Sequence, residues 1–381
     1  MPKKIFLIAC EASADSHTAY LVQALKKHVP DAELRGLGGP KMAASGVNLL
    51  QDMTKISALG LGDVIRQYFT YRKIFYEALN DVKRWQPDVV VLVDSPAFNL
   101  RFAKKLKNQT PKIPVIYYIS PQIWAWGGRR IHTIKRIISK MLCILPFEIA
   151  LYEKAGIPCE FVGHPLIDHM KISRGRDEMR KKLGVSNSQW AVGLLPGSRQ
   201  SEVRRILPIM LKAASHLQRD LPNTLFFLAE SSNVENTVYE EVFRDADVRV
   251  QRFSDHFYEH IAAMDFALVT SGTATLETAL AGTPFFLLYK TSGSTYFLGK
   301  HLIRVPYLGI VNLLAGKRVV PEFIQQDAHP ETIAHEAKVL LKNKELYGKM
   351  KQEFLEVRAK LGEGGASIKA ARAVMEFLKK G

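Results

Sequence analysis

One buried-looking segment of the chain ends in a carboxylate. Residues 89–99 read VVVLVDSPAFN, so five apolar residues lead directly to Asp94. A short, wholly apolar, β-branched run is typical of a strand covered on both faces of a parallel sheet. Open α/β sheets bind ligands at the carboxyl ends of their strands. The pattern therefore predicts that Asp94 lies where a ligand would bind, although an aspartate here can also cap the following helix.

A second segment, LLPGSRQSEV (194–203), combines a tight turn with a phosphate-binding side chain. We expect the strand to end at Leu195, Pro-Gly to turn the chain, and Ser198 to open a helix. Gly197 and Ser198 supply an open backbone, and the Arg199 guanidinium suits a phosphate. In the alternative interpretation, Ser198 caps the helix, Glu202 favours its dipole and Arg199 is solvated.

A third strand–turn–helix segment, ALVTSGTATLETALAGTP (267–284), has a similar layout. Ser271, Gly272 and Thr273 form a polar entry to a helix whose backbone amides can bind an anion. Glu277 lies about one helical turn further on and can accept two hydrogen bonds from a sugar diol. Together these features favour a nucleotide site, although Glu277 can instead complement the helix dipole.

The first expected strand leads into CEASADSHTAY, which contains several small residues. Ala12, Ser13 and Ala14 allow the backbone to approach a ligand closely, and the helix that follows presents free N–H groups. Ser13 or Asp15 can equally serve as a helix cap.

Known cofactor motifs do not explain these turns. None of them reads GxGxxG and no GxxxxGK[ST] occurs, which disfavours dinucleotide oxidoreductases and P-loop enzymes. The Asp-Ala-Asp string at 245–247 is far from any phosphate-binding turn, so we interpret it as a solvated loop. The three cysteines, Cys10, Cys143 and Cys159, suggest neither a disulfide framework nor a zinc site.

Composition indicates a soluble globular protein with an excess of positive charge. The formal net charge is +16 and the pI about 9.6, with Lys and Arg exceeding Asp and Glu by 10 over residues 1–165. Such a chain attracts polyanions, anionic membranes or phosphorylated substrates. No run of 18 apolar residues occurs, and the amino terminus predicts a first strand rather than a signal peptide, so we expect cytosolic residence.

Strand-like runs alternate with helical patterns along the whole chain. This alternation predicts an α/β fold with parallel sheets in two Rossmann-like domains that face a cleft. We expect domains at 1–170 and 171–350, and a helical segment at 351–381 that packs on the first domain or on a partner subunit. The expected strands are Ile5–Ala9, Glu33–Leu37, Val89–Val93, Val115–Ile119, Met141–Leu145, Cys159–Val162, Val192–Leu195, Leu225–Ala229, Val248–Gln251, Phe266–Thr270 and Pro284–Leu288.

Two segments carry features of a surface for anionic partners. Ala58–Tyr76 mixes apolar and aromatic residues with Arg66, Arg72 and Lys73, as a helix at a membrane interface does. A core-facing helix with cations at its edges is the alternative. Residues 127–140 place five cations on an expected helix, which can face lipid or phosphate or be simply solvated.

Nine ordered blocks resemble the lipid-A-disaccharide synthase family. They are CEASAD, GGPKMAASG (38–46), DSPAFN (94–99), YYISPQIWAW (117–126), LPFE (145–148), FVGHP (161–165), LLPGSRQSEV, TSGTATLE and NLLAG (312–316). The resemblance implies a two-domain GT-B glycosyltransferase. It implies that UDP-2,3-diacylglucosamine is joined to 2,3-diacylglucosamine 1-phosphate, with inversion, giving a β(1→6) disaccharide and UDP. It further implies a Gram-negative enzyme, peripheral on the cytosolic face of the inner membrane.

The resemblance also implies roles for individual residues. Asp94 is then the general base, and Asn99 with the retained Glu11, Ser13 and Asp15 belongs to the acceptor loop. The UDP-binding set comprises Gly197, Ser198, Arg199, Glu202, Ser271, Gly272, Thr273, Glu277, Asn312 and Gln325. Arg199 and the helix amides would stabilise the diphosphate, so we expect no metal and no cofactor. Cys10 and Ala14 stand where the family usually has glycine.

The expected partners follow from this reaction, and rival functions remain. We expect an anionic inner-membrane surface, contacted through Ala58–Tyr76 and Thr291–Tyr307, a homodimer as one option, and no nucleic acid. The rival enzymes are a peptidoglycan N-acetylglucosaminyltransferase and a UDP-N-acetylglucosamine 2-epimerase. A non-catalytic polyanion binder is the rival of another class, although no nucleic-acid reader motif occurs.

Overall fold

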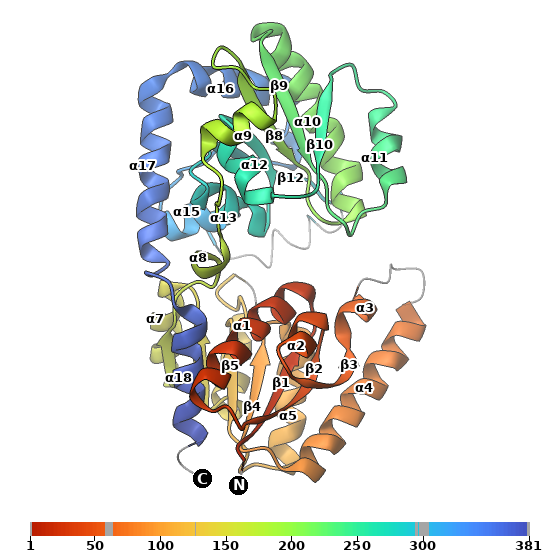
Figure 1. Cartoon of the computed structure of the whole chain (residues 1–381), viewed down its shortest axis with the longest axis vertical. Helices are drawn as coiled ribbons and strands as arrows, with labels where there is room; N and C mark the ends of the chain where they lie inside the picture. The colour runs from red at the N-terminus through yellow and green to blue at the C-terminus, as the bar shows by residue number, and fades with distance from the viewer. Residues whose placement is uncertain (1, 58–63, 126, 294–295, 297–304, 379–381) are drawn as a thin grey trace. The chain divides into compact units, whose positions relative to one another are not determined.

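The computed structural model describes residues 2–57, 64–125, 127–293, 296 and 305–378 (Figure 1). The chain forms two compact units. The first comprises Met1–Asp168 together with Leu361–Gly381, and the second comprises His169–Lys360. The carboxyl-terminal segment thus belongs to the unit that contains the amino terminus.

The first unit is built on a seven-stranded sheet in which all neighbouring strands run parallel. The strand order is β3-β2-β1-β4-β5-β6-β7. Every residue of β4 is buried, as its unbroken apolar sequence predicts. The strands are β1 (Lys4–Ala9), β2 (Glu33–Gly38), β3 (Asn48–Asp52), β4 (Val89–Val93), β5 (Val115–Tyr118), β6 (Lys140–Cys143) and β7 (Cys159–Phe161).

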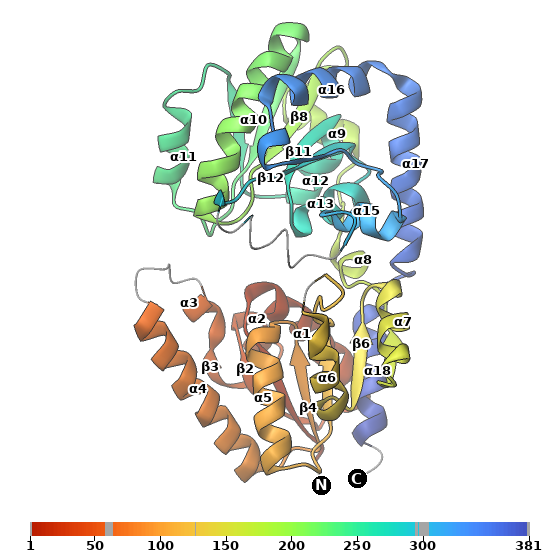
Figure 2. The ribbon, with the colours of Figure 1, turned by 180° about the vertical axis from the view of Figure 1, so that it is seen from behind.

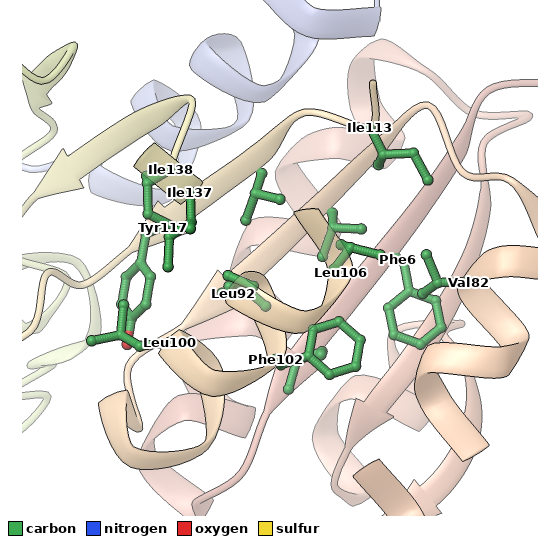
Figure 3. Close-up of a cluster of buried hydrophobic side chains, with 14 of the residues drawn as sticks. Phe6, Val82, Leu92, Leu100, Phe102, Leu106, Ile113, Tyr117, Ile137 and Ile138 are labelled. Atoms are coloured by element: carbon green, nitrogen blue, oxygen red, sulfur yellow. The ribbon is translucent and has the colours of Figure 1, made fainter. Parts of the chain in front are cut away.

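Helices cover both faces of this sheet (Figures 1 and 2). One face packs against α4 (Val64–Trp85), α5 (Pro96–Gln109), α6 (Ile131–Ile137) and α7 (Pro146–Lys154). Figure 3 shows part of this core, where Phe6 of β1 lies between Val82 of α4 and Phe102 of α5. The other face packs against α1 (Ala12–His28) and α18 (Ala366–Leu378). Shorter helices are α2 (Pro40–Ala44), α3 (Met53–Ser57), η2 (Gly128–Arg130) and α8 (Leu166–His169).

The second unit contains a six-stranded parallel sheet with the order β10-β9-β8-β11-β12-β13. Its strands are β8 (Trp190–Leu195), β9 (Thr224–Ala229), β10 (Val250–Phe253), β11 (Phe266–Thr270), β12 (Phe285–Tyr289) and β13 (Glu322–Ile324). Its helices are α9 (Arg176–Lys182), α10 (Gln200–Asp220), α11 (Asn236–Phe243), α12 (Phe257–Ala263), α13 (Thr273–Leu280), α15 (Ile310–Ala315), η3 (Gln325–Asp327), α16 (Pro330–Lys342) and α17 (Lys344–Lys360).

Each sheet contains one point at which the strand order reverses. In the first sheet β1 and β4 lie side by side, and in the second sheet β8 and β11 do. The chain segments that leave such neighbouring strands diverge toward opposite faces, which opens a crevice at the carboxyl ends. The four sequence segments that were predicted to bind substrates lie at the carboxyl ends of these four strands.

The structure confirms the predicted α/β fold with parallel sheets and corrects some boundaries. Two edge strands, β3 and β13, were not expected, because neither contains a long apolar run. Helix α10 begins at Gln200 with Arg199 as its N-cap, so the prediction that Ser198 opens this helix was wrong. Among the described residues, no helix combines the length and the apolar character needed to cross a membrane.

Candidate functional site

Asp94 sits on an unusual piece of backbone directly after β4. Its φ is +52° and that of Ser95 is +46°, a left-handed conformation that costs non-glycine residues about 1–3 kcal/mol each. Pro96 follows as the first residue of α5, and a residue before proline avoids the right-handed helical region. Because a residue before proline favours extended backbone, the Asp-Ser-Pro sequence does not specify this left-handed turn, and the surrounding structure must hold it.

The peptide of Asp94 is fixed by three hydrogen bonds. Its N–H donates to the Tyr118 carbonyl at 3.1 Å, and its own carbonyl accepts from Tyr117 Oη at 2.5 Å and Asn99 Nδ2 at 2.7 Å. Asn99 is fully buried and also donates to the Val93 carbonyl at 3.1 Å. We therefore assign Asn99 to holding the Asp94 turn rather than to direct contact with an acceptor.

The surroundings of Asp94 raise the pKa of its carboxyl group. Burial raises the pKa of Asp94 to about 6, the backbone of Ser95 opposes this rise, and the negative charge of Glu11 adds to it. Glu11 comes close because Ala9 of β1 pairs with Val93 of β4. Sequence reasoning missed Ser95, whose Oγ is buried without a hydrogen-bond partner among the described residues. The signal that could have found it is its place directly after the strand.

The other acceptor-loop residues of α1 differ in exposure. Ser13 is exposed in the first turn of α1 and stays a prediction. Asp15 is only 2% exposed and accepts backbone hydrogen bonds from Gly39, Lys41 and Met42 at 2.8–3.0 Å. The carboxylate of Asp15 thereby caps α2, so its contact with an acceptor would be indirect.

In the second unit, the turn after β8 is built around a glycine and a glutamate. Gly197 has φ of +104°, and a Cβ atom there would lie 2.4 Å from Glu202 Oε2. The same carboxylate oxygen accepts hydrogen bonds from the N–H groups of Ser198 at 3.1 Å and Arg199 at 3.3 Å. Glu202 Oε1 pairs with Arg199 Nη1 at 2.7 Å. Glu202 thus occupies the donors that we predicted for a diphosphate.

The turn after β11 is more open. Gly272 and Thr273 are exposed, and no side chain caps the start of α13. Thr270 Oγ1 is buried just before this turn, with no hydrogen-bond partner among the described residues. Burial raises the pKa of Glu277, which accepts a hydrogen bond from Tyr258 Oη at 3.1 Å. Since Leu195 of β8 pairs with Val269 of β11, the two turns are neighbours at one sheet edge.

A family model described as lipid-A-disaccharide synthetase matches residues 5–376. The chain belongs to the lipid-A-disaccharide synthase family. A lipid-A-disaccharide synthase of Syntrophus aciditrophicus (strain SB) is 40% identical over 381 residues, covering 99% of this chain and 98% of the relative. The resemblance that the sequence blocks indicated is thereby confirmed.

Solved structures of low identity share the fold. A UDP-GlcNAc 2-epimerase from Neisseria meningitidis bound to UDP-GlcNAc matches with a TM-score of 0.66 and 14% identity, covering 100% of both chains. The calicheamicin glycosyltransferase CalG4 matches with a TM-score of 0.60 and 13% identity, covering 100% of this chain and 99% of that one. These likenesses support the GT-B assignment of the fold and carry no information on substrate.

Two residues assigned to UDP through the lipid-A-disaccharide synthase resemblance are engaged within the protein. Asn312 is fully buried; its Nδ2 donates to the Val320 carbonyl and Glu322 Oε1, and its Oδ1 accepts from the N–H groups of Val319 and Val320, all at 2.7–2.9 Å. Gln325 exchanges two hydrogen bonds with the backbone of Thr291. Nucleotide contact through these side chains would require breaking these bonds, and the UDP-binding role of both residues stays a prediction.

Glu322 is a further positioning residue that sequence reasoning missed. At the start of β13 its carboxylate accepts hydrogen bonds from the N–H groups of Leu308 and Gly309 at 3.0 and 2.9 Å, in addition to that from Asn312. It therefore fixes the beginning of α15, where the family block NLLAG lies.

The departures from the family's glycines do not disturb the first loop. Cys10 and Ala14 are both buried, and neither has positive φ, so a side chain is compatible with each backbone conformation. Burial also raises the pKa of the Cys10 thiol, which keeps it protonated. Within the described part of the chain, no group of three or more His, Cys, Asp and Glu side chains could hold a metal ion.

Proposed function

We propose that this chain joins UDP-2,3-diacylglucosamine to 2,3-diacylglucosamine 1-phosphate, with inversion at the anomeric carbon and release of UDP. Family membership makes it a disaccharide-forming glycosyltransferase and does not favour the epimerase or the peptidoglycan transferase. The observation that carries the mechanism is Asp94, a largely buried carboxyl group at the ligand-binding edge of the first sheet.

Asp94 serves as the general base in this proposal. A single inverting displacement needs one group to accept the proton of the acceptor 6-hydroxyl as its oxygen attacks the anomeric carbon. A pKa of about 6 leaves Asp94 ionised at neutral pH yet basic enough to accept a proton. A positioned base is worth roughly 10²–10⁴-fold in rate, or about 3–5 kcal/mol of barrier.

The turns of the second unit stabilise the departing diphosphate. The open start of α13 offers backbone N–H groups from Thr273 onward, and Arg199, whose side chain is 78% exposed, offers a guanidinium. These groups supply positive charge where negative charge develops, so we propose a metal-independent transfer. Glu277 would accept hydrogen bonds from the ribose diol, with Tyr258 orienting its carboxylate.

Binding of the diphosphate requires an exchange of anions. Glu202 holds Arg199 and the Ser198 amide, so a phosphate that takes these donors displaces the carboxylate. Residue 197 must be a glycine in this turn, because a Cβ atom there would clash with the Glu202 side chain. The proposal therefore includes a change of partner for Arg199 from Glu202 to the nucleotide.

The acyl chains of both substrates require a membrane surface, for which three helices of the first unit are the candidates. On α4, Phe69 is 59% and Tyr76 43% exposed, and the Arg72 guanidinium lies 6.0 Å from the Tyr76 ring centroid. Residues 95–147 contain ten Lys and Arg and no Asp or Glu. Their exposed cations on α5 and α6 include Arg101, Lys104, Lys105, Lys135 and Arg136. Of the segments predicted from sequence, residues 58–63, 294–295 and 297–304 lie outside the described part of the chain.

This surface can be tested with vesicles. Charge reversal by Lys104→Glu with Lys105→Glu should weaken binding to anionic vesicles, measured by sedimentation, by roughly 30-fold or more, since each cation near such a surface contributes about 1 kcal/mol. Arg205→Glu with Lys212→Glu on α10 is the matched control, because these cations are also exposed but belong to the second unit. Equal binding by both variants would contradict the proposed surface.

We also propose residence on the cytosolic face of a Gram-negative inner membrane and leave dimerisation to a mass measurement in solution.

One experiment tests the reaction itself. The purified protein is incubated with the two diacyl monosaccharides, and the products are identified by mass spectrometry. We expect disaccharide 1-phosphate and UDP in equal amounts, with a rate that EDTA leaves unchanged. Absence of disaccharide would refute the proposed reaction, and a rate abolished by EDTA and restored by Mg²⁺ would refute its metal independence.

A further inference from the structure

The loop that follows β5, the strand next to β4 in the sheet, contains a tryptophan, Trp124. Val93 of β4 pairs with Tyr118 of β5, so Ile119 is the neighbour of Asp94 at the sheet edge. Ile119 has φ of +63°, which is rare for a β-branched residue and marks a sharp change of direction. Trp124 lies five residues further along this loop and is half-buried.

Trp124 is held from two sides by residues of the next strand–helix connection. Its Nε1 donates a hydrogen bond to Glu148 Oε1 at 3.1 Å. Its ring meets the ring of Phe147 edge to face, with centroids 5.1 Å apart and planes at 88°. Both the hydrogen bond and the edge-to-face ring contact depend on direction, so together they fix the orientation of the indole ring.

Glu148 is an unusual residue to find at this place. It is 1% exposed and is the first acidic residue after Asp94 in the sequence. Its Oε2 accepts the Leu145 N–H at 3.1 Å, as expected of a glutamate in the first turn of α7. That cap requires one oxygen only, whereas the second oxygen reaches a different loop. Burying a carboxyl group is costly, so the bond to Trp124 indicates a role beyond the helix cap.

We propose that Trp124 packs against the acceptor sugar and that Glu148 is the positioning residue that orients its ring. The inference rests on the proposed function and deepens it by assigning the acceptor platform. Hexose rings present faces of C–H groups, which pack against aromatic rings, while their hydroxyl groups bond to polar side chains at the rim. The Asp94 carboxylate supplies such a polar group at the same sheet edge.

The first unit offers a matched control. Trp85 at the end of α4 donates from Nε1 to Glu33 Oε2 at 3.3 Å, and Glu33 begins β2. This second tryptophan–glutamate pair therefore lies at the amino ends of the strands, the edge opposite to that of Asp94. Trp85→Phe removes the same N–H group as Trp124→Phe without touching the proposed platform.

The test measures the acceptor and the donor separately. Trp124→Phe and Glu148→Gln should each raise the KM for the acceptor about tenfold at saturating donor and leave the KM for the donor within twofold. The double variant should resemble the weaker single variant, because both changes release the same ring. Trp85→Phe should leave both KM values unchanged. A KM for the acceptor within twofold of the wild type in Trp124→Phe, or an equal rise for donor and acceptor, would overturn the inference.

Two further measurements keep the inference separate from folding and from the reaction. If Glu148→Gln unfolds, Trp124→Phe alone decides, since it keeps an aromatic ring and the Glu148–Leu145 bond. Calorimetric binding of the acceptor monosaccharide without donor tests the platform independently of turnover. Weaker binding by Trp124→Phe than by Trp85→Phe supports the platform even if the wild type forms no disaccharide, whereas equal binding refutes it.

Discussion

The two sheets of this protein share one topology and differ at the edge where their strand order reverses. After β4 the chain presents a carboxylate on non-glycine residues with positive φ, largely buried. After β8 and β11 it presents glycines, exposed turns and helix starts. Burial at the first edge raises the pKa of the Asp94 carboxyl group. At the second edge the start of α13 is uncapped, and Glu202 holds the N–H groups of the turn after β8. Under the proposed function, one backbone plan would serve proton transfer in the first unit and anion binding in the second.

The largest predicted effect is the loss of turnover when Asp94, the carboxylate of the first edge, is replaced. Asp94→Asn keeps the size of the side chain and removes its basicity, so kcat should fall roughly 10²–10⁴-fold while UDP affinity stays unchanged. Turnover by mass spectrometry and UDP binding by calorimetry check the two halves of this expectation. Near-normal turnover of the variant would eliminate Asp94 as the base.

Asp15 tests whether the first edge also depends on a purely structural carboxylate. Asp15→Asn replaces an acceptor of three backbone N–H groups by an amide, which should lower the free energy of unfolding by about 1–3 kcal/mol. Thermal unfolding measures this loss, and Asp31→Asn at an exposed position is the control. A variant with unchanged stability but weakened acceptor binding would instead return Asp15 to the acceptor loop.

Arg199 tests whether the second unit binds the phosphates of the nucleotide. Arg199→Ala should weaken UDP binding about tenfold, equivalent to about 1.4 kcal/mol, and should leave uridine binding unaffected. Arg205→Ala, an exposed arginine on the same helix, is the control. An equal loss of uridine and UDP affinity would show that the guanidinium does not act on the phosphates.

The smallest predicted effect is a shift of the pH–rate profile when the negative charge of Glu11 is removed. Asp94 must be ionised to accept a proton, so the rate should fall tenfold per pH unit below about 6. Glu11→Gln removes a negative neighbour, lowers the pKa of Asp94 and moves this acid limb to lower pH by less than one unit. A pH–rate profile measures the shift against Glu33→Gln, and an unmoved or upward-shifted limb would contradict the coupling.

Every central strand was predictable from sequence, whereas two of the four edge strands of these two sheets, β3 and β13, were not. Val89–Val93 and Phe266–Thr270 have the bounds expected for them, because strands buried on both faces consist almost entirely of apolar residues, with Thr270 as the exception here. Edge strands β3 and β13 have partly exposed residues, and polar side chains are tolerated there. Hydrophobic patterning therefore identifies every central strand, whereas among the partly exposed edge strands it identified β7 and β10 and missed β3 and β13.

The candidate site was predictable in position but less so in the role of each side chain. Motif spacing located the Asp94, Gly197 and Gly272 turns, since these follow strands directly. It did not reveal that Asp15 and Asn312 hold backbone groups, because those groups come from other loops. For Asp15 the partner Gly39 lies 24 residues away, and only the folded chain brings the two together.

The return of α18 to the first sheet has a consequence for how the protein is made. Leu21, Val22 and Leu25 of α1 share a core with Ala370, Ala371 and Val374 of α18. During synthesis the apolar surface of α1 emerges from the ribosome before the second unit, yet its cover in α18 is translated after that unit. The nascent first unit thus stays unfinished while all of the second is produced. A stop codon near residue 360 would therefore damage the half of the protein that was translated first.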